Sequence, residues 1–225
     1  MARLARVVIP GIPHLVTQRG NARARTFFSD ADYALYRDML AGHCRAADVE
    51  VWAWCLMPTH VHLLLVPHDA DGLRRALAPL HRRYAGLIHA RRKRTGHFWH
   101  GRFGAVALDD DHLAAALAYV SLNPVRARLV KRARDWRWSS TRAHLAGKRD
   151  GLTALAPVKK RFRRFADLLA AEPDAEAFAR LRAAESIGRP LGSDAFLARL
   201  ERATKRRLKP QKRGPKPKAG KARLK

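Results

Sequence analysis

The sequence is poor in cysteine and has no long apolar run. Cys44 and Cys55 are the only cysteines, which is too few for a disulfide framework, and they do not have the C-x-x-C spacing of a metal site. No apolar run approaches the ~18 residues that a membrane-spanning helix needs. Pro10 and Pro13 interrupt the short apolar stretch near the N-terminus, which argues against a signal peptide. We therefore expect a cytoplasmic protein without a membrane partner.

Acidic residues are also scarce. The chain of 225 residues has 19 Asp and Glu against 46 Lys and Arg, a formal net charge of +27. Such an excess attracts polyanions, above all nucleic acid, because each neutralised phosphate releases condensed counterions. An anionic membrane surface is a weaker candidate, since no long amphipathic helix carries Trp or Phe on one face. Charge alone is equally compatible with a ribosomal or architectural protein.

Apolar periodicity predicts alternating strands and helices in the first part of the chain. Strand character marks residues 12–17, 49–55, 60–66 and 103–108. Helical spacing follows the capping-box residues Ser29 and Asp32, follows Asp71, and runs from about His112 until Pro124 ends the helix. This order favours an α+β fold, an antiparallel sheet with helices on one face.

The composition changes after residue 150. Residues 162–171, 175–186 and 194–203 are predicted to be helical, and the last two surround a glycine-containing turn. This pair fits either a helix-turn-helix DNA reader or a hairpin that only packs on the main domain. From Lys205 onward there are eleven basic residues and no acid, so a tail that follows phosphates is expected. The predicted organisation is a main α+β domain (1–150), a small C-terminal helical extension (151–204) and a disordered basic tail (205–225).

Two histidines carry the first chemical signal. His60 and His62 are two residues apart in a predicted strand, so both imidazoles point to one face and can converge on one divalent ion. The spacing alone is weak evidence, and surface or satisfied core histidines would show it too. However, unpaired imidazoles are costly in so apolar a strand, and no cysteine or third nearby histidine completes a closed zinc shell. The pair suits an open Mg²⁺ or Mn²⁺ site that needs an oxygen ligand.

Tyr119 is distinguished from the other three tyrosines by its place on the helical wheel. The other three lie on the apolar stripes of their helices, whereas Tyr119 projects roughly 110° from the centre of its stripe. Asn123 follows one turn later on nearly the same side. Both side chains can therefore face a neighbouring site. A partly exposed tyrosine beside a helix-ending asparagine would give the same pattern.

These residues also resemble those of a known family. Residues 57–65 (MPTHVHLLL) resemble the M-P-x-H-x-H-L-L-L segment of the single-tyrosine transposases of the HUH endonuclease class. Residues 119–127 (YVSLNPVRA) resemble the Y-I/V-x-x-N-P-V-R-A signature of their REP-associated branch. Further similar segments, at residues 12–21, 98–103 and 138–140, occur in the same order. Thr59 replaces the Asn or Asp usual in relatives, at a position that is not a ligand.

The resemblance implies a ferredoxin-like or RRM-like fold and a transposase that nicks single-stranded DNA with REP-like hairpins. It marks residues 1–150 as the catalytic domain and implies a bacterial, nucleoid-associated protein. It implies that Tyr119 is the nucleophile and that a divalent metal ion, Mg²⁺ or Mn²⁺, is held by His60, His62 and Asn123. The product would be a 5′-phosphotyrosine beside a free 3′-OH, and rejoining would need no ATP because the link keeps the phosphodiester energy. Candidate DNA contacts, each of which fits a solvated surface side chain equally well, are Arg19, Asn21, Arg23, Arg102 and Arg126.

Two other functions fit the same sequence. One is a non-catalytic nucleic-acid-binding regulator on an RRM-like fold, and the other is a metallohydrolase that uses activated water. Trp99, Trp136 and Trp138 are candidates to stack on bases, although core packing is the favoured interpretation. The sequence leaves open the hairpin that is cut, the physiological metal and the choice between a mobile-element and a host role. Monomer and homodimer also stay open, because related subunits exchange their tyrosine helices whereas an extension like this one favours a self-sufficient monomer.

Overall fold

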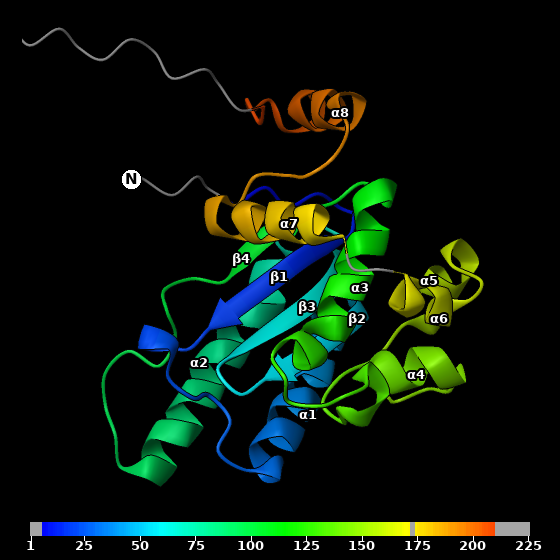
Figure 1. The fold of residues 1–225 in the computed structure, drawn as a ribbon. Coiled ribbons are helices and arrows are strands. Elements are labelled where there is room, and N and C mark those ends of the chain that lie inside the picture. The colour runs from blue at the N-terminus through cyan, green and yellow to red at the C-terminus, as the bar shows by residue number, and fades with distance from the viewer. Residues whose placement is uncertain (1–5, 172–173, 210–225) are drawn as a thin grey trace, which may run out of the picture.

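The computed structural model describes residues 6–171 and 174–209. Within these ranges it contains a four-stranded antiparallel sheet and eight α-helices, arranged as Figure 1 shows. Most of the predicted basic tail (205–225) lies outside the described residues.

The sheet has the strand order β2-β3-β1-β4. Its strands are β1 (His14–Arg19), β2 (Val49–Met57), β3 (His60–Pro67) and β4 (Gly104–Ala107). A helix joins β1 to β2 and another joins β3 to β4, whereas a tight hairpin at Pro58 and Thr59 joins β2 to β3. This βαββαβ connection is the ferredoxin-like arrangement. The α+β fold class predicted from the sequence is confirmed.

Helices α1 (Asp30–Ala46) and α2 (Gly72–Arg92) cover one face of the sheet. The predicted capping box is present at the start of α1, where Ser29 and Asp32 each bond to the other's backbone N–H. Tyr36 and Tyr84 are fully buried between these helices and the sheet, with their rings 5.2 Å apart. The face of the sheet that α1 and α2 cover is therefore buried in the apolar core.

The opposite face is also covered, in contrast to the expectation of helices on one face only. Helix α3 (Asp110–Arg126) and, from the C-terminal extension, α7 (Ala175–Ile187) lie over it, on the near side in Figure 1. The prediction that Pro124 ends α3 is wrong. Although proline cannot donate a backbone hydrogen bond, the Asn123 carbonyl accepts from the Ala127 N–H at 2.9 Å, so the helix continues to Arg126.

Four more helices complete the extension and its connection to the sheet domain. They are α4 (Thr141–Ala146), α5 (Leu155–Arg161), α6 (Phe165–Ala170) and α8 (Asp194–Thr204), and two short 3₁₀ turns, η1 (Asn21–Arg23) and η2 (Ala133–Asp135), lie in earlier loops. Helix α7 packs on α3 and β4, and α8 buries Phe196 and Leu200 against Val7 near the N-terminus. Helix α5 also packs on β2 and α6 on α3, so all four helices of the extension contact the sheet domain.

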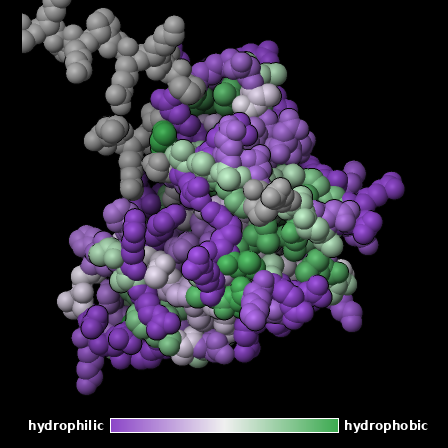
Figure 2. Space-filling view, viewed as in Figure 1, coloured by the Kyte–Doolittle hydropathy of each residue, from purple (hydrophilic) through white to green (hydrophobic). Residues whose placement is uncertain are grey.

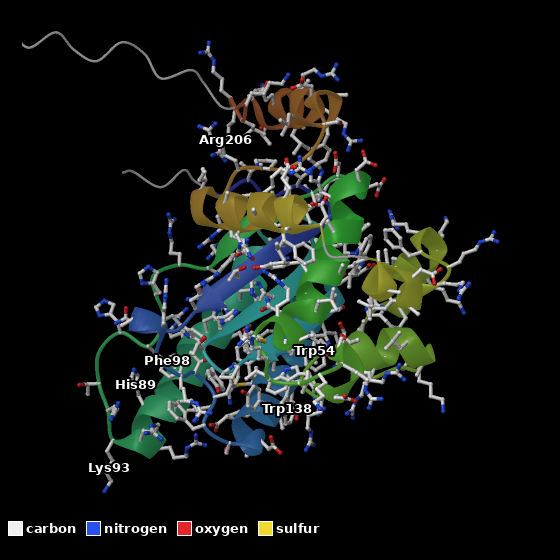
Figure 3. All side chains as sticks on the ribbon, viewed as in Figure 1. Trp54, His89, Lys93, Phe98, Trp138 and Arg206 are labelled. Atoms are coloured by element: carbon white, nitrogen blue, oxygen red, sulfur yellow. The ribbon has the colours of Figure 1, made fainter. Side chains whose placement is uncertain are left out.

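The segment that follows η2 covers the outer edge of β2. The Leu56 N–H donates to the Trp138 carbonyl, and the Ser140 N–H donates to the Trp54 carbonyl, both at 2.9 Å. The Trp138 ring stacks on Tyr33 at 5.0 Å, and Trp54 and Trp138 lie close together in Figure 3. Core packing was favoured over base stacking for the tryptophans. For Trp138, which is buried, this is confirmed.

Hydrophilic side chains dominate the face of the molecule that Figure 2 shows. On the face shown in Figure 2, hydrophobic side chains gather mainly over α3 and the neighbouring α5 and α6. Within residues 6–171 and 174–209, no helix has both the length and the apolar character needed to cross a membrane.

Candidate active site

The two histidines of β3 project from the sheet face that α3 and α7 cover. Strand pairing places His62 opposite Thr17 and His60 opposite Arg19 of β1. The imidazole rings are edge to face with centroids 4.8 Å apart. The predicted alignment of both rings on one side of the sheet is therefore present.

The ring nitrogens of His60 and His62 differ in their hydrogen-bond partners. Nδ1 of His60 lies 2.9 Å from Oγ1 of Thr59, the residue at the departure from the family pattern. Nδ1 of His62 lies 3.2 Å from a carboxylate oxygen of Glu185, while its buried Nε2 has no hydrogen-bond partner among the described residues. Burial, and then the charges of His62 and Arg19, lower the pKa of His60 to about 2. The His60 ring is therefore neutral, the form that binds a metal ion.

Tyr119 reaches this pair from α3. Its ring packs edge-on against that of His62 with centroids 5.2 Å apart. The expectation that Tyr119 faces away from the apolar core is wrong, since only 3% of the residue is exposed. Phe178 of α7 covers it, with ring centroids 5.3 Å apart. The wheel of α3 could not reveal this cover, because α7 lies far along the chain.

The surroundings of the phenol disfavour its ionisation. Burial, followed by the negative charge of Glu185, raises the pKa of Tyr119 to about 12. Arg126 and Arg19 act in the opposite direction, and the Arg126 guanidinium lies 5.4 Å from the centre of the phenol ring. Tyr119 is therefore neutral in this arrangement, and it lies next to two imidazoles and near the positive charges of Arg126 and Arg19.

The fold and this geometry agree with comparisons to known proteins. The model of a family described as "Transposase IS200 like" matches residues 12–123. Over this segment, 112 of its 225 residues, the chain is similar to the IS200-like transposases. The matched segment holds both β3 histidines, Tyr119 and Asn123, whereas α7 lies beyond it.

Two individual proteins are similar to this chain. A REP-associated tyrosine transposase of Haemophilus influenzae is 28% identical over 116 residues, which is 47% of this chain and 66% of that protein. The alignment thus spans slightly less than two thirds of the relative. A solved structure, a REP-associated tyrosine transposase bound to a REP hairpin, superposes with a TM-score of 0.56. It is 23% identical, and the match covers 69% of this chain and 90% of the other, which establishes the common fold.

Glu185 is a member of the site that the sequence did not reveal. Its carboxylate accepts a hydrogen bond from the Thr17 hydroxyl at 2.5 Å, meets Nδ1 of His62, and lies 3.6 Å from the Arg19 guanidinium. Although burial alone would raise its pKa, the charge of His62 and the hydrogen bonds from His62 and Thr17 lower it. A charged carboxylate from the extension is therefore held at the centre of the site.

Asn123 lies on the same helix as Tyr119 but is not hydrogen-bonded to the two histidines in the described chain. It is half-buried one turn after Tyr119. No group of three or more His, Cys, Asp or Glu side chains in that same part of the chain could hold a metal ion. A metal site here would need the two imidazoles and a neutral oxygen donor such as the Asn123 amide.

The other predicted DNA contacts are distributed unevenly. Arg19 and Arg126 reach the tyrosine–histidine centre, as their contacts with Glu185 and Tyr119 show. Arg102 lines a neighbouring pocket together with Arg19. Asn21 and Arg23 lie in the exposed turn η1, which the Asn21 N–H ties to the Phe98 carbonyl at 2.9 Å. Their predicted role therefore gains no support from contacts within the site.

Proposed function

We propose that this chain nicks and rejoins single-stranded, hairpin-bearing DNA through a covalent link to Tyr119. The observation that carries the proposal is the edge-on contact of the Tyr119 phenol with His62, whose buried Nε2 finds no hydrogen-bond partner in residues 6–171 and 174–209. A buried imidazole nitrogen without a partner is costly unless a ligand takes it. The similarity to the IS200-like transposase family and the REP hairpin bound by the structural neighbour support DNA as the substrate.

The residues present fit a divalent metal ion. His60 and His62 would hold it through Nε2, because Thr59 and Glu185 contact the Nδ1 atoms, and the Asn123 amide oxygen is the candidate third ligand. Two imidazoles and one oxygen donor suit Mn²⁺ or Mg²⁺ with positions left for phosphate oxygens. Such an ion, when bound, offsets the negative charge that develops on the scissile phosphate.

The covalent step requires one bond exchange at phosphorus. The Tyr119 oxygen loses its proton and attacks the phosphorus, and the bond to the 3′ oxygen of the preceding nucleotide breaks. The leaving oxygen takes a proton and becomes a free 3′-OH, while the phosphate remains on Tyr119 through its 5′ side. Arg126 and Arg19 favour the phenolate that this step needs, since both lower the pKa of Tyr119. Attack by a 3′-OH on the phosphotyrosine reverses the process without ATP.

Access of the phosphate to Tyr119 requires a movement of α7. The phenol is 3% exposed beneath Phe178, so a phosphodiester cannot approach it in the arrangement described. The proposed function therefore includes displacement of at least the Phe178 end of α7 when DNA binds.

The test is a denaturation-resistant adduct between the protein and hairpin-bearing single-stranded DNA in the presence of Mn²⁺. Tyr119→Phe and His60→Ala should abolish it, whereas Tyr33→Phe, the same change on the opposite face of the sheet, should not. Cleavage without an adduct would replace the proposal with hydrolysis by activated water. Binding that is unaffected by Tyr119→Phe, with no cleavage by any form, would indicate a regulator.

A further inference from the structure

A pocket of about 380 Å³ borders the proposed catalytic centre. It lies where β1 and β4 meet the C-terminal end of α7 and the loop before β4. Its volume is within the ~300–1,000 Å³ range of ligand sites. Four arginines from four different segments line it: Arg6, Arg19, Arg102 and Arg182.

The arginines are held together against their mutual repulsion. The Arg6 guanidinium lies 3.7 Å above the Phe103 ring, and its Nε donates to the Phe103 carbonyl at 3.0 Å, so this side chain is fixed in place. Burial, and then the charge of Arg102, lower the pKa of Arg6. Among the described residues that line the pocket, Glu185 is the only carboxylate. The pocket thus has a local excess of positive charge.

The pocket and the catalytic centre share a wall. Thr17 and Glu185 line the pocket, and the same two side chains contact Nδ1 of His62. His62 in turn contacts the ring of Tyr119. A chain of phosphates that reaches Tyr119 would therefore have its next segment beside these arginines.

The geometry points to this arginine pocket as the binding site for the single-stranded DNA next to the cleaved phosphate. The inference rests on the proposed function, and it adds a contribution of the extension to substrate binding through Arg182. Guanidinium groups bind phosphate oxygens in a fork geometry, and a positively charged groove that follows the backbone is typical of single-strand binding sites. Duplex DNA in the hairpin stem would lie elsewhere.

The test measures binding separately from cleavage. In a Tyr119→Phe background, the affinity for a fluorescent hairpin oligonucleotide with a single-stranded tail is compared with that for the same hairpin without the tail. The tested variant is Arg102→Gln combined with Arg182→Gln. The matched control is Arg180→Gln, which lies on the same helix, is exposed, and pairs with Glu176 at 3.6 Å. Circular dichroism confirms that the variants are folded.

The double variant should bind the tailed hairpin about tenfold more weakly, because two charge-assisted contacts are lost. The dependence of log affinity on log salt should become shallower by about 0.7 for each arginine replaced. Arg180→Gln should change neither quantity, and the hairpin without a tail should be affected much less. Equal binding by the double variant and the control, or equal losses with both hairpins, would overturn the inference.

Adduct formation by proteins that retain Tyr119 separates the two proposals. If Tyr119 forms the adduct while the arginine variants bind the tail normally, the pocket inference fails and the proposed function stands. If the arginine variants lose binding to the tail but no form of the protein makes an adduct, the pocket inference stands and the proposed function fails.

Discussion

Replacing Phe178 by alanine should release Tyr119 from its cover. The Phe178 ring is 3% exposed, lies edge-on to Tyr119, and holds the Arg126 guanidinium 4.9 Å from its centre. Its removal opens a path for water to the phenol while Glu185 and Arg182 stay on the same helix. The substitution therefore acts first on the burial of Tyr119, although it also frees the Arg126 guanidinium that Phe178 contacts.

The magnitude follows from the pKa of Tyr119. A rise from 10 to about 12, caused first by burial and then by Glu185, disfavours the phenolate by about 3 kcal/mol. Because Glu185 remains in the variant, we expect only part of the rise to disappear, about one pKa unit. At pH 8 the phenolate fraction would then increase about tenfold, and the rate of adduct formation by at most the same factor. The docking of α7 should weaken by about 3–5 kcal/mol, as for other buried phenylalanines.

Carbon-13 NMR of tyrosine labelled at the ζ carbon measures this pKa directly in metal-free protein. The resonance that is missing from the spectrum of Tyr119→Phe belongs to Tyr119. Tyr33 is an internal control, because burial raises its pKa to about 12 on the opposite face of the sheet, where Phe178 has no influence. Phe196→Ala is the matched control for stability, since it removes a buried phenylalanine of the extension from a different cluster.

The result that would refute this reasoning is a Tyr119 pKa that stays near 12 in Phe178→Ala. The cover by α7 would then not be what suppresses ionisation. A parallel fall at Tyr33 would show general loosening of the fold, which also contradicts a local role for Phe178.

Three further outcomes are expected. The free energy of unfolding should fall as the pH drops below about 6.5. Burial lowers the pKa of His14 to about 4 and of His81 to about 3, so both histidines take up protons when the protein unfolds. Urea midpoints measured against pH should show this decline, and His81→Gln should make the decline less steep. Gly104→Ala should speed amide exchange in α7, since the new Cβ would lie 3.0 Å from the Glu185 backbone oxygen, whereas Gly86→Ala, with nothing within 4 Å, should not. EDTA should abolish adduct formation and added Mn²⁺ should restore it, and an adduct that resists chelation would contradict the metal site.

The parts of the fold predicted correctly depend on local periodicity. Successive side chains of a strand point to opposite faces of the sheet, and this rule was enough to place His60 and His62 on one face of β3. A capping box marked the start of α1. Helices α7 and α8 were predicted to within about a residue at each end, since Ser193 and Gly188 mark their boundaries. Such signals act within a few residues of the element that they define.

The parts that were missed depend on contacts between distant segments. Thr17 and Glu185 are 168 positions apart, and no spacing rule connects them. The burial of Tyr119 has the same origin, because the wheel of α3 identifies the side that faces the sheet but not the side that a later helix covers. Pro124 was expected to end α3, yet the Asn123 carbonyl accepts a hydrogen bond from Ala127 and carries the helix onward.

The central claim is that the Tyr119 oxygen becomes linked to DNA. Mass spectrometry of the protease-digested adduct, formed with hairpin-bearing single-stranded DNA and Mn²⁺, tests it most directly. We expect a nucleotide on the peptide that contains Tyr119, joined through a 5′ phosphate, and a released DNA fragment with a free 3′-OH. A nucleotide on any other residue, or cut DNA with a free 5′ phosphate and unmodified protein, would contradict the account.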